Sequence, residues 1–122
     1  MSDYSVEFFK DKRGHYPAKE YIDQWPEEHQ GKIANVIKLL QQMGPLLRRP
    51  YADLLRDKIY ELRPIHSGYQ HRILYSFDGR VIVLTHGFLK KTDEVESSEI
   101  DFAIRCMNEW FLGKEKAKRG AK

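Results

Sequence analysis

The residues best suited to chemistry lie in the second half of the chain, within segments that have the composition of β-strands. Arg63 ends the run YELR, Arg72 stands in HRILY, and His86 follows the apolar run VIVLT. An arginine presents a planar fork of donors to a phosphate, and a histidine can exchange a proton near neutral pH. Such a set could cleave RNA without a metal. A base would take the 2′-hydroxyl proton, and the oxygen would attack the adjacent phosphate while the arginines stabilise the developing charge. The 5′-oxygen would leave with a proton from an acid.

Further cations stand near these residues in the sequence and could hold an RNA backbone. From Arg48 to Lys91 the chain has nine Lys and Arg against four Asp and Glu, a local net charge of +5 in a chain whose total is +3. Such a stretch suits a polyanionic partner, although a solvated basic surface is an equally good explanation. We assign RNA binding to Lys90, Lys91, Arg48, Arg49, Arg56 and, through base stacking, Tyr75.

Each arginine also has a purely structural interpretation. Arg63 and Arg72 could pair with Glu61 or Asp57 on a sheet surface, where ion pairs contribute little to stability. Arg72 has the strand parity of Leu74, so its aliphatic stem could simply cover apolar area. The sequence leaves the structural and the functional interpretation open.

The histidine and the tyrosine have the same ambiguity. His86 has the strand parity of Ile82 and Leu84, which predicts a core histidine with a satisfied hydrogen bond. Gly87 could introduce a bulge that turns His86 towards another face. Tyr75 could be a core or cross-strand aromatic residue instead of a platform for a base.

Other chemistries find little support in the sequence. The single cysteine, Cys106, excludes an internal disulfide and a cysteine-based zinc site. His66, His71 and His86 lack typical zinc spacing, and no phosphate-binding glycine loop or HExxH motif occurs, so neither a metal nor a cofactor is expected. No basic segment followed by an apolar leader and no membrane-spanning apolar run is present, so we expect a cytoplasmic protein without a membrane partner.

The elements that must position these residues follow from periodicity and turn residues. Pro17 can begin a helix over 17–25, and apolar residues at helical spacing predict a second helix from Glu27 to the stop at Gly44-Pro45. Residues 45–58 are expected to be a loop. Strands are predicted over 5–9, 59–63 and 69–77 and from Val81 onwards, with Asp78-Gly79 as a hairpin turn, and a third helix over 98–113.

The resulting order, β-α-α-β-β-β-α, predicts the α+β class, with a small antiparallel sheet and helices packed on one face. The other face or its rim would then be free for function. With 122 residues the chain is expected to form a single domain over 1–113, followed by a basic, disordered tail over 114–122.

Taken together, the runs ELR, RILY and HGFLKKT, in this order between residues 59 and 103, resemble the phage-derived HigB-like branch of the RelE/ParE toxin superfamily. The resemblance covers nearly the whole chain. It implies a small α+β sheet with two N-terminal helices. It also implies the toxin of a type II toxin-antitoxin system, a metal-independent, ribosome-dependent endoribonuclease that cuts mRNA and inhibits translation. The implied partners are a helix-turn-helix antitoxin, the ribosome and mRNA.

The resemblance also implies roles for single residues. Arg63 and Arg72 match the basic positions along the RNA groove of such toxins, and Lys90 and Lys91 match paired cations after the final strand. His86 stands where histidine is common in this branch, and we assign it as an acid or a base. The sequence departs from the family pattern after KKT, where DEVESSEI replaces an expected proline and adds negative charge near the site.

Two other functions are compatible with the same scaffold. ParE-like members of the superfamily inhibit DNA gyrase, and a phage-derived relative could be a catalytically inactive binding protein. Because unrelated activities share one fold, the fold cannot decide between them.

Overall fold

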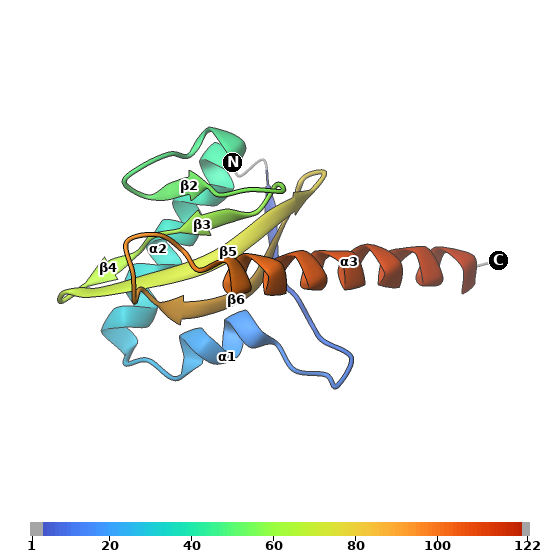
Figure 1. The fold of residues 1–122 in the computed structure, drawn as a ribbon, viewed down its shortest axis with the longest axis horizontal. Coiled ribbons are helices and arrows are strands. Elements are labelled where there is room, and N and C mark those ends of the chain that lie inside the picture. The colour runs from blue at the N-terminus through green and yellow to red at the C-terminus, as the bar shows by residue number, and fades with distance from the viewer. Residues whose placement is uncertain (1–3, 121–122) are drawn as a thin grey trace.

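One sheet organises the part of the chain that the structure, a computed structural model, describes: residues 4–120 (Figure 1). The elements are β1 (Ser5–Phe8), α1 (Pro17–Asp23), α2 (Glu27–Met43), the 3-10 turn η1 (Gly44–Leu46), β2 (Ala52–Leu54), β3 (Tyr60–Leu62), β4 (Ile65–His66), β5 (Tyr69–Asp78), β6 (Val81–Leu89) and α3 (Ser97–Gly120). The predicted α+β class and the predicted order of the main elements are confirmed. The expected loop over 45–58 contains η1 and β2, and β4 is a further short strand.

The strands of the main sheet lie in the order β1-β6-β5-β3-β2, and β4 pairs with β5. All neighbours are antiparallel except β1, which runs parallel to β6 with Ser5 opposite Val81. The sheet is therefore mixed, not purely antiparallel. Local patterns predict each strand but carry no information on the direction of a partner that is more than 70 residues away, such as Val81 for Ser5.

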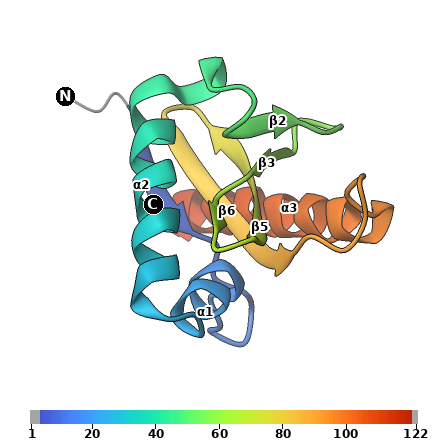
Figure 2. The same cartoon turned by 90° about the vertical axis from the view of Figure 1, so that its left-hand side faces the viewer.

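Helices cover both faces of this sheet (Figure 2), so the expectation that they pack on one face is wrong. On one face α2 packs against alternate residues of β5 and β6, such as Ile73 and Ile82. On the opposite face α3 packs against the residues between them, such as Leu74 and Val83. The apolar runs of β5 and β6 are continuous because both of their sides are buried, as in a sheet between two helical layers.

A bulge in β6 determines where His86 points. Leu84 pairs with Tyr75 and His86 with Leu74, which leaves Thr85 without a partner residue on β5. The Thr85 hydroxyl donates to the Leu74 carbonyl over 3.1 Å. Because the bulge adds one residue, His86 faces α3 while Leu84 faces α2. The re-aiming of His86 is confirmed, but Thr85 causes it and Gly87 does not.

The last helix is longer than the sequence analysis predicts. α3 continues through Gly113 to Gly120, so the expected helix end at 113 and the expected disorder of 114–120 do not hold. Lys, Glu, Ala and Arg have high helix propensity, and one internal glycine costs only about 1 kcal/mol. Residues 121–122 of the expected tail lie outside the described residues.

Gly87 allows α1 to lie close to β6. A β-carbon at Gly87 would lie 2.5 Å from Cδ2 of Tyr21, whereas a β-carbon at Gly31 in α2 would meet nothing within 4 Å. We predict that Gly87→Ala lowers the free energy of unfolding by about 1–3 kcal/mol, because the Tyr21 ring must move. The control Gly31→Ala should raise it by about 0.5–1 kcal/mol. Urea denaturation measures both changes, and equal effects would contradict the close packing.

Candidate functional site

Arginines from separate segments converge on one carboxylate, Glu61, on the sheet face that α3 covers. Arg72 on β5 places Nε 3.1 Å from Glu61 Oε1, and Arg63 Nη1 donates to Oε2 over 2.8 Å. Arg72 also donates to the carbonyl of His71 over 2.9 Å. The charge of Arg49 contributes to lowering the pKa of Arg72. Arg49 Nη2 itself lies 3.0 Å from Asp53 Oδ2. We call Arg49, Arg63, Arg72 and Glu61 the arginine cluster.

The centre of the arginine cluster is buried. Arg72 is 2% exposed and Glu61 is 3% exposed, while the side chain of Arg63 is 18% exposed. Burial lowers the pKa of Arg72, and the charges of Arg63 and Arg49 lower it further against the opposing effect of Glu61. Two guanidinium groups share one buried carboxylate. The pairing with Glu61 that the structural interpretation expected is therefore present, in the interior and not on the surface.

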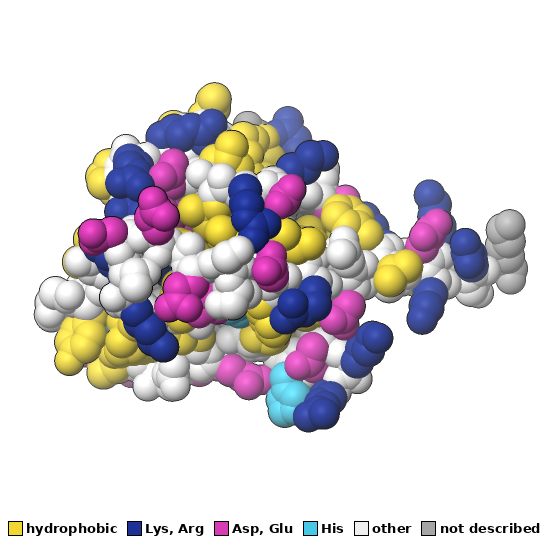
Figure 3. All heavy atoms as spheres, in the orientation of Figure 1, with side chains coloured by type: hydrophobic (Ala, Val, Ile, Leu, Met, Phe, Trp, Pro, Cys, Tyr) yellow, Lys and Arg dark blue, Asp and Glu magenta, His cyan; other side chains and the backbone are white. Residues whose placement is uncertain are grey.

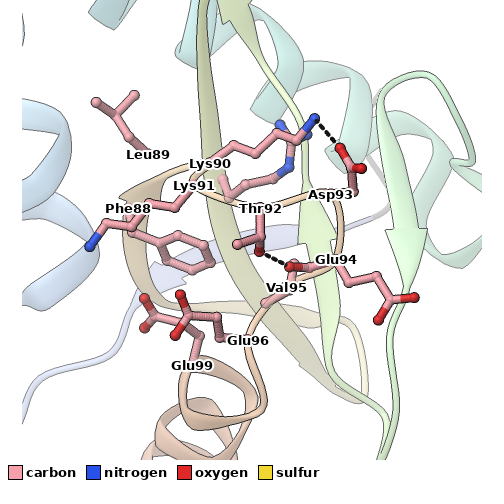
Figure 4. Close-up of a pocket in the computed structure, with 11 residues that line it drawn as sticks. Phe88, Leu89, Lys90, Lys91, Thr92, Asp93, Glu94, Val95, Glu96 and Glu99 are labelled. Carbon is pink, nitrogen blue, oxygen red and sulfur yellow. Dashed lines mark hydrogen bonds and ion pairs between the residues drawn. The ribbon is translucent and has the colours of Figure 1, made fainter.

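An acidic loop covers the remaining path from Arg72 to solvent. Arg72 lines a hollow together with Phe88, the loop over 90–96 and Glu99 (Figure 4). Lys90 Nζ lies 3.8 Å from Asp93 Oδ1, and Lys91 is exposed on the same loop. This loop contains the DEVE segment, with Asp93, Glu94 and Glu96 among the residues that line the hollow.

His86 lies on the same face but is also buried. Its Nε2 is 3.0 Å from Glu99 Oε1 in the first turn of α3, and its Nδ1 is 3.2 Å from the Thr85 hydroxyl. The rings of Phe88 and Phe102 flank the imidazole. Burial lowers the pKa of His86, although Glu99 opposes the shift. The contact joins β6 to α3, so it contributes to the packing of that helix.

The remaining predicted RNA-binding residues divide between the two faces. Arg56 binds Asp101 and Ser97 of α3 over 2.8 Å and lines, with Arg49, a shallow depression beside Glu61. Arg48 instead donates to the carbonyl of Pro45 in η1 over 2.7 Å.

Tyr75 does not fit its predicted role. It is 1% exposed in the core beneath α2, and its ring stacks on Tyr60 with the centroids 5.3 Å apart. An RNA base cannot reach a side chain in this position. The alternative of a cross-strand aromatic pair describes Tyr75 correctly, because Tyr60 is its partner residue on β3.

Sequence reasoning missed a hydrogen-bonded network on the α2 face. His71 Nδ1 is 2.6 Å from the Tyr21 hydroxyl, and His71 Nε2 is 2.9 Å from His29 Nδ1. Trp25 packs edge-on against His71. The one signal in the sequence for this network is the group of aromatic and histidine residues Tyr21, Trp25 and His29, which spans the end of α1 and the start of α2.

Burial governs the ionisation of this network. It lowers the pKa of His71 to about 4, with further lowering by the charges of His29 and His66, and it raises the pKa of Tyr21 to about 12.

Within residues 4–120, no group of three or more His, Cys, Asp or Glu could hold a metal ion. Over the same described residues, no helix has the length and apolar character needed to cross a bilayer.

Comparison of the sequence with known families finds a toxin-like family of the RelE/HigB type. The family model "Phage derived protein Gp49-like (DUF891)" matches residues 20–108, well over half of the chain. The chain belongs to this family of phage-derived Gp49-like proteins. No curated protein matches the sequence.

The His71 network predicts a loss of stability in mild acid. Between the ordinary histidine pKa of 6.5 and about 4, the unfolded chain binds a proton at His71 that the folded chain does not bind. The protonation of His71 therefore does not affect the free energy of unfolding above pH 6.5. Between pH 6.5 and about 4 it lowers the free energy of unfolding by up to about 1.4 kcal/mol per pH unit. NMR titration of the imidazoles should find His71 neutral down to about pH 4. Titration near pH 6.5 would contradict the network.

The buried Arg72–Glu61 pair predicts unequal effects of single and double substitutions. Arg72→Met should lower the free energy of unfolding by about 3 kcal/mol, because Oε1 of Glu61 loses its buried partner while the more exposed Arg63 bonds only to Oε2. The double variant Glu61→Met/Arg72→Met should recover most of this loss, because the buried carboxylate is removed together with its buried partner. Urea denaturation of both variants tests the pair, and additive losses would show that Glu61 does not need Arg72.

Proposed function

We propose that this protein is the toxin of a type II toxin-antitoxin system and cuts mRNA on the ribosome without a metal. The observation that carries the proposal is the arginine cluster on one sheet face, next to Lys90 and Lys91 at the end of β6. Membership of a toxin-like family supports it. The proposed site of action is the cytoplasm, where the ribosomes are.

In this proposal the cations have separate roles. Lys90 and Lys91 bind the RNA backbone, and a phosphate replaces Asp93 as the partner of Lys90. Arg63, the most exposed arginine on Glu61, stabilises the negative charge that develops when the 2′-oxygen attacks the phosphate. Arg72 orients Glu61 and Arg63 from beneath and reaches the phosphate after the loop over 90–96 has moved.

His86 remains the candidate acid or base, but its Nε2 is bound to Glu99. It can exchange a proton with substrate only when the first turn of α3 moves away. A site that must open in this way gains from an external template that orients the RNA. The proposal therefore includes the ribosome as a required partner, and naked RNA as a poor substrate.

The proposed antitoxin is a helix-turn-helix protein that covers or distorts the positive face. Complementary charge between the two proteins would make their association fast and sensitive to salt. An acidic or helical segment of the antitoxin would compete with RNA for Lys90, Lys91 and Arg63.

Arg63→Ala tests the proposed reaction with least risk to the fold, because Glu61 keeps Arg72 as its partner. We predict that this variant cuts mRNA in a translation extract about 10²-fold more slowly than the wild type. Arg13→Ala, which removes an exposed arginine from the loop after β1, is the control and should cut at the wild-type rate. Circular dichroism confirms the folding of both variants. Equal rates for all three proteins would remove Arg63 from the mechanism.

A toxin that binds its target without cutting RNA is the second candidate, and the burial of Arg72 and His86 favours it. A gyrase-binding toxin of this kind would induce a DNA damage response while translation continues. The RNA-cleaving toxin would stop translation first. Expression of the wild type without antitoxin, followed by pulse labelling of protein synthesis, separates the two.

A further inference from the structure

The C-terminal part of α3 extends away from the body of the protein (Figure 1). The first part of the helix packs on the sheet through Ile100, Ala103, Cys106 and Met107. From Phe111 to Gly120 every side chain is exposed, and Phe111 and Leu112 are 46% and 56% exposed. The match to the family model ends at residue 108, before this extension begins. We call residues 111–120 the α3 extension.

The α3 extension carries the whole net positive charge of the chain. Between Lys114 and Arg119 there are four Lys and Arg and one acidic residue, a net charge of +3. The rest of the chain has 17 Lys and Arg and 17 Asp and Glu, a net charge of zero. Figure 3 shows basic side chains on several sides of the extension. A polyanion near this protein would therefore be attracted to the extension as well as to the basic segment between Arg48 and Lys91.

Some cations of the sheet already have acidic partners. Between Arg48 and Lys91, five of nine cations are paired, namely Arg49, Arg56, Arg63, Arg72 and Lys90, whereas Arg48, Lys58, Arg80 and Lys91 have no ion pair within residues 4–120.

In the extension, Lys114 pairs with Asp78 at 2.6 Å, and Arg119 lies 3.9 Å from Glu115. Lys116 and Lys118 have no ion pair within residues 4–120. Binding of phosphate by these two lysines would break no existing ion pair.

The arrangement of the cations around the helix favours folded RNA over a membrane surface. At 3.6 residues per turn, Lys114, Lys116, Lys118 and Arg119 point in directions spread around the axis. A helix that lies on a membrane needs an apolar face opposite its cations. The exposed apolar residues Phe111 and Leu112 stand only in the first turn of the extension, and between Lys114 and Arg119 the only apolar residue is Ala117. Cations on several sides suit a partner that presents phosphates on several sides, as the two strands of an RNA duplex do.

We propose that the α3 extension binds the phosphate backbone of double-helical RNA, at a place separate from the arginine cluster. Lys116 and Lys118 supply the main contacts, and release of counterions from the RNA supplies most of the free energy. The identification of this RNA as ribosomal rests on the proposed function, whereas the binding of duplex RNA does not. On the ribosome, the extension would anchor the toxin while the sheet face acts on the message.

The test compares three full-length proteins: the wild type, Lys116→Gln/Lys118→Gln, and the control Lys32→Gln/Lys38→Gln. The control removes the same charge from exposed positions on α2. Glutamine has nearly the helix propensity of lysine, so the helices should persist, and circular dichroism checks this. Binding to a mixed-sequence RNA duplex of about 20 base pairs, chosen to exceed the span of one such helix, is measured between about 50 and 200 mM salt.

Lys116→Gln/Lys118→Gln should bind the duplex about tenfold more weakly at the lowest salt, and the slope of log affinity against log salt should fall by about 2. The control should bind like the wild type. Equal binding by both variants would overturn the proposal. Unchanged RNA binding together with lost binding to polyglutamate would also overturn it, in favour of an acidic protein partner. A wild type that binds duplex RNA but does not cut translated mRNA would refute the proposed function and leave this inference standing.

Discussion

The burial of β5 and β6 on both faces is the constraint on which the rest of this structure depends. With α2 on one side and α3 on the other, every residue of the central hairpin must be apolar or have a partner. The pairing of Arg72 with Glu61, of His86 with Glu99, and of His71 with Tyr21 and His29 follows from this constraint. Arg72, His86 and His71 are each bound to a residue of a neighbouring element. The polar contacts therefore fix the positions of the helices.

The fold also changes how the basic segment between Arg48 and Lys91 is interpreted. The positive charge between Arg48 and Lys91 is compensated in part once the chain folds, because Glu61, Asp53, Asp101 and Asp93 lie next to five of the nine cations. Arg63 and Lys91 keep access to solvent, while Arg72 does not. The functional face is thus a set of cations bound to carboxylates, from which a phosphate must displace an acidic group. Such a site differs from an open basic groove.

The loop over 90–96 and α3 form one unit over this face. Asp93 binds Lys90, and Glu99 binds His86 at the start of the helix. The other end of the same helix carries a net charge of +3 on its exposed residues. One helix therefore joins the cover of the arginine cluster to the basic extension.

The sequence by itself determined the elements that depend on local chemistry. Helical spacing of Ile33, Val36 and Leu40 predicted α2, Asp78-Gly79 predicted the hairpin, and the runs around Arg63, Arg72 and His86 resembled a toxin family that the family match supports. Periodicity and turn preference act between residues that are close along the chain, so a sequence window contains them. The interpretation of Arg63 and Arg72 as partners of Glu61 was also within reach, because Glu61 and Arg63 are two residues apart.

Only the tertiary structure decided which residues meet across long separations. The parallel pairing of β1, the turn of His86 towards α3 by Thr85, and the burial of Tyr75 depend on partners far along the chain. The hydrogen bond between Tyr21 and His71 joins residues that are 50 positions apart. The sequence around Tyr21 does not indicate that His71 is its partner. Burial, and with it the pKa of each buried group, is set by the elements that pack on a residue. The sequence window around that residue does not contain them.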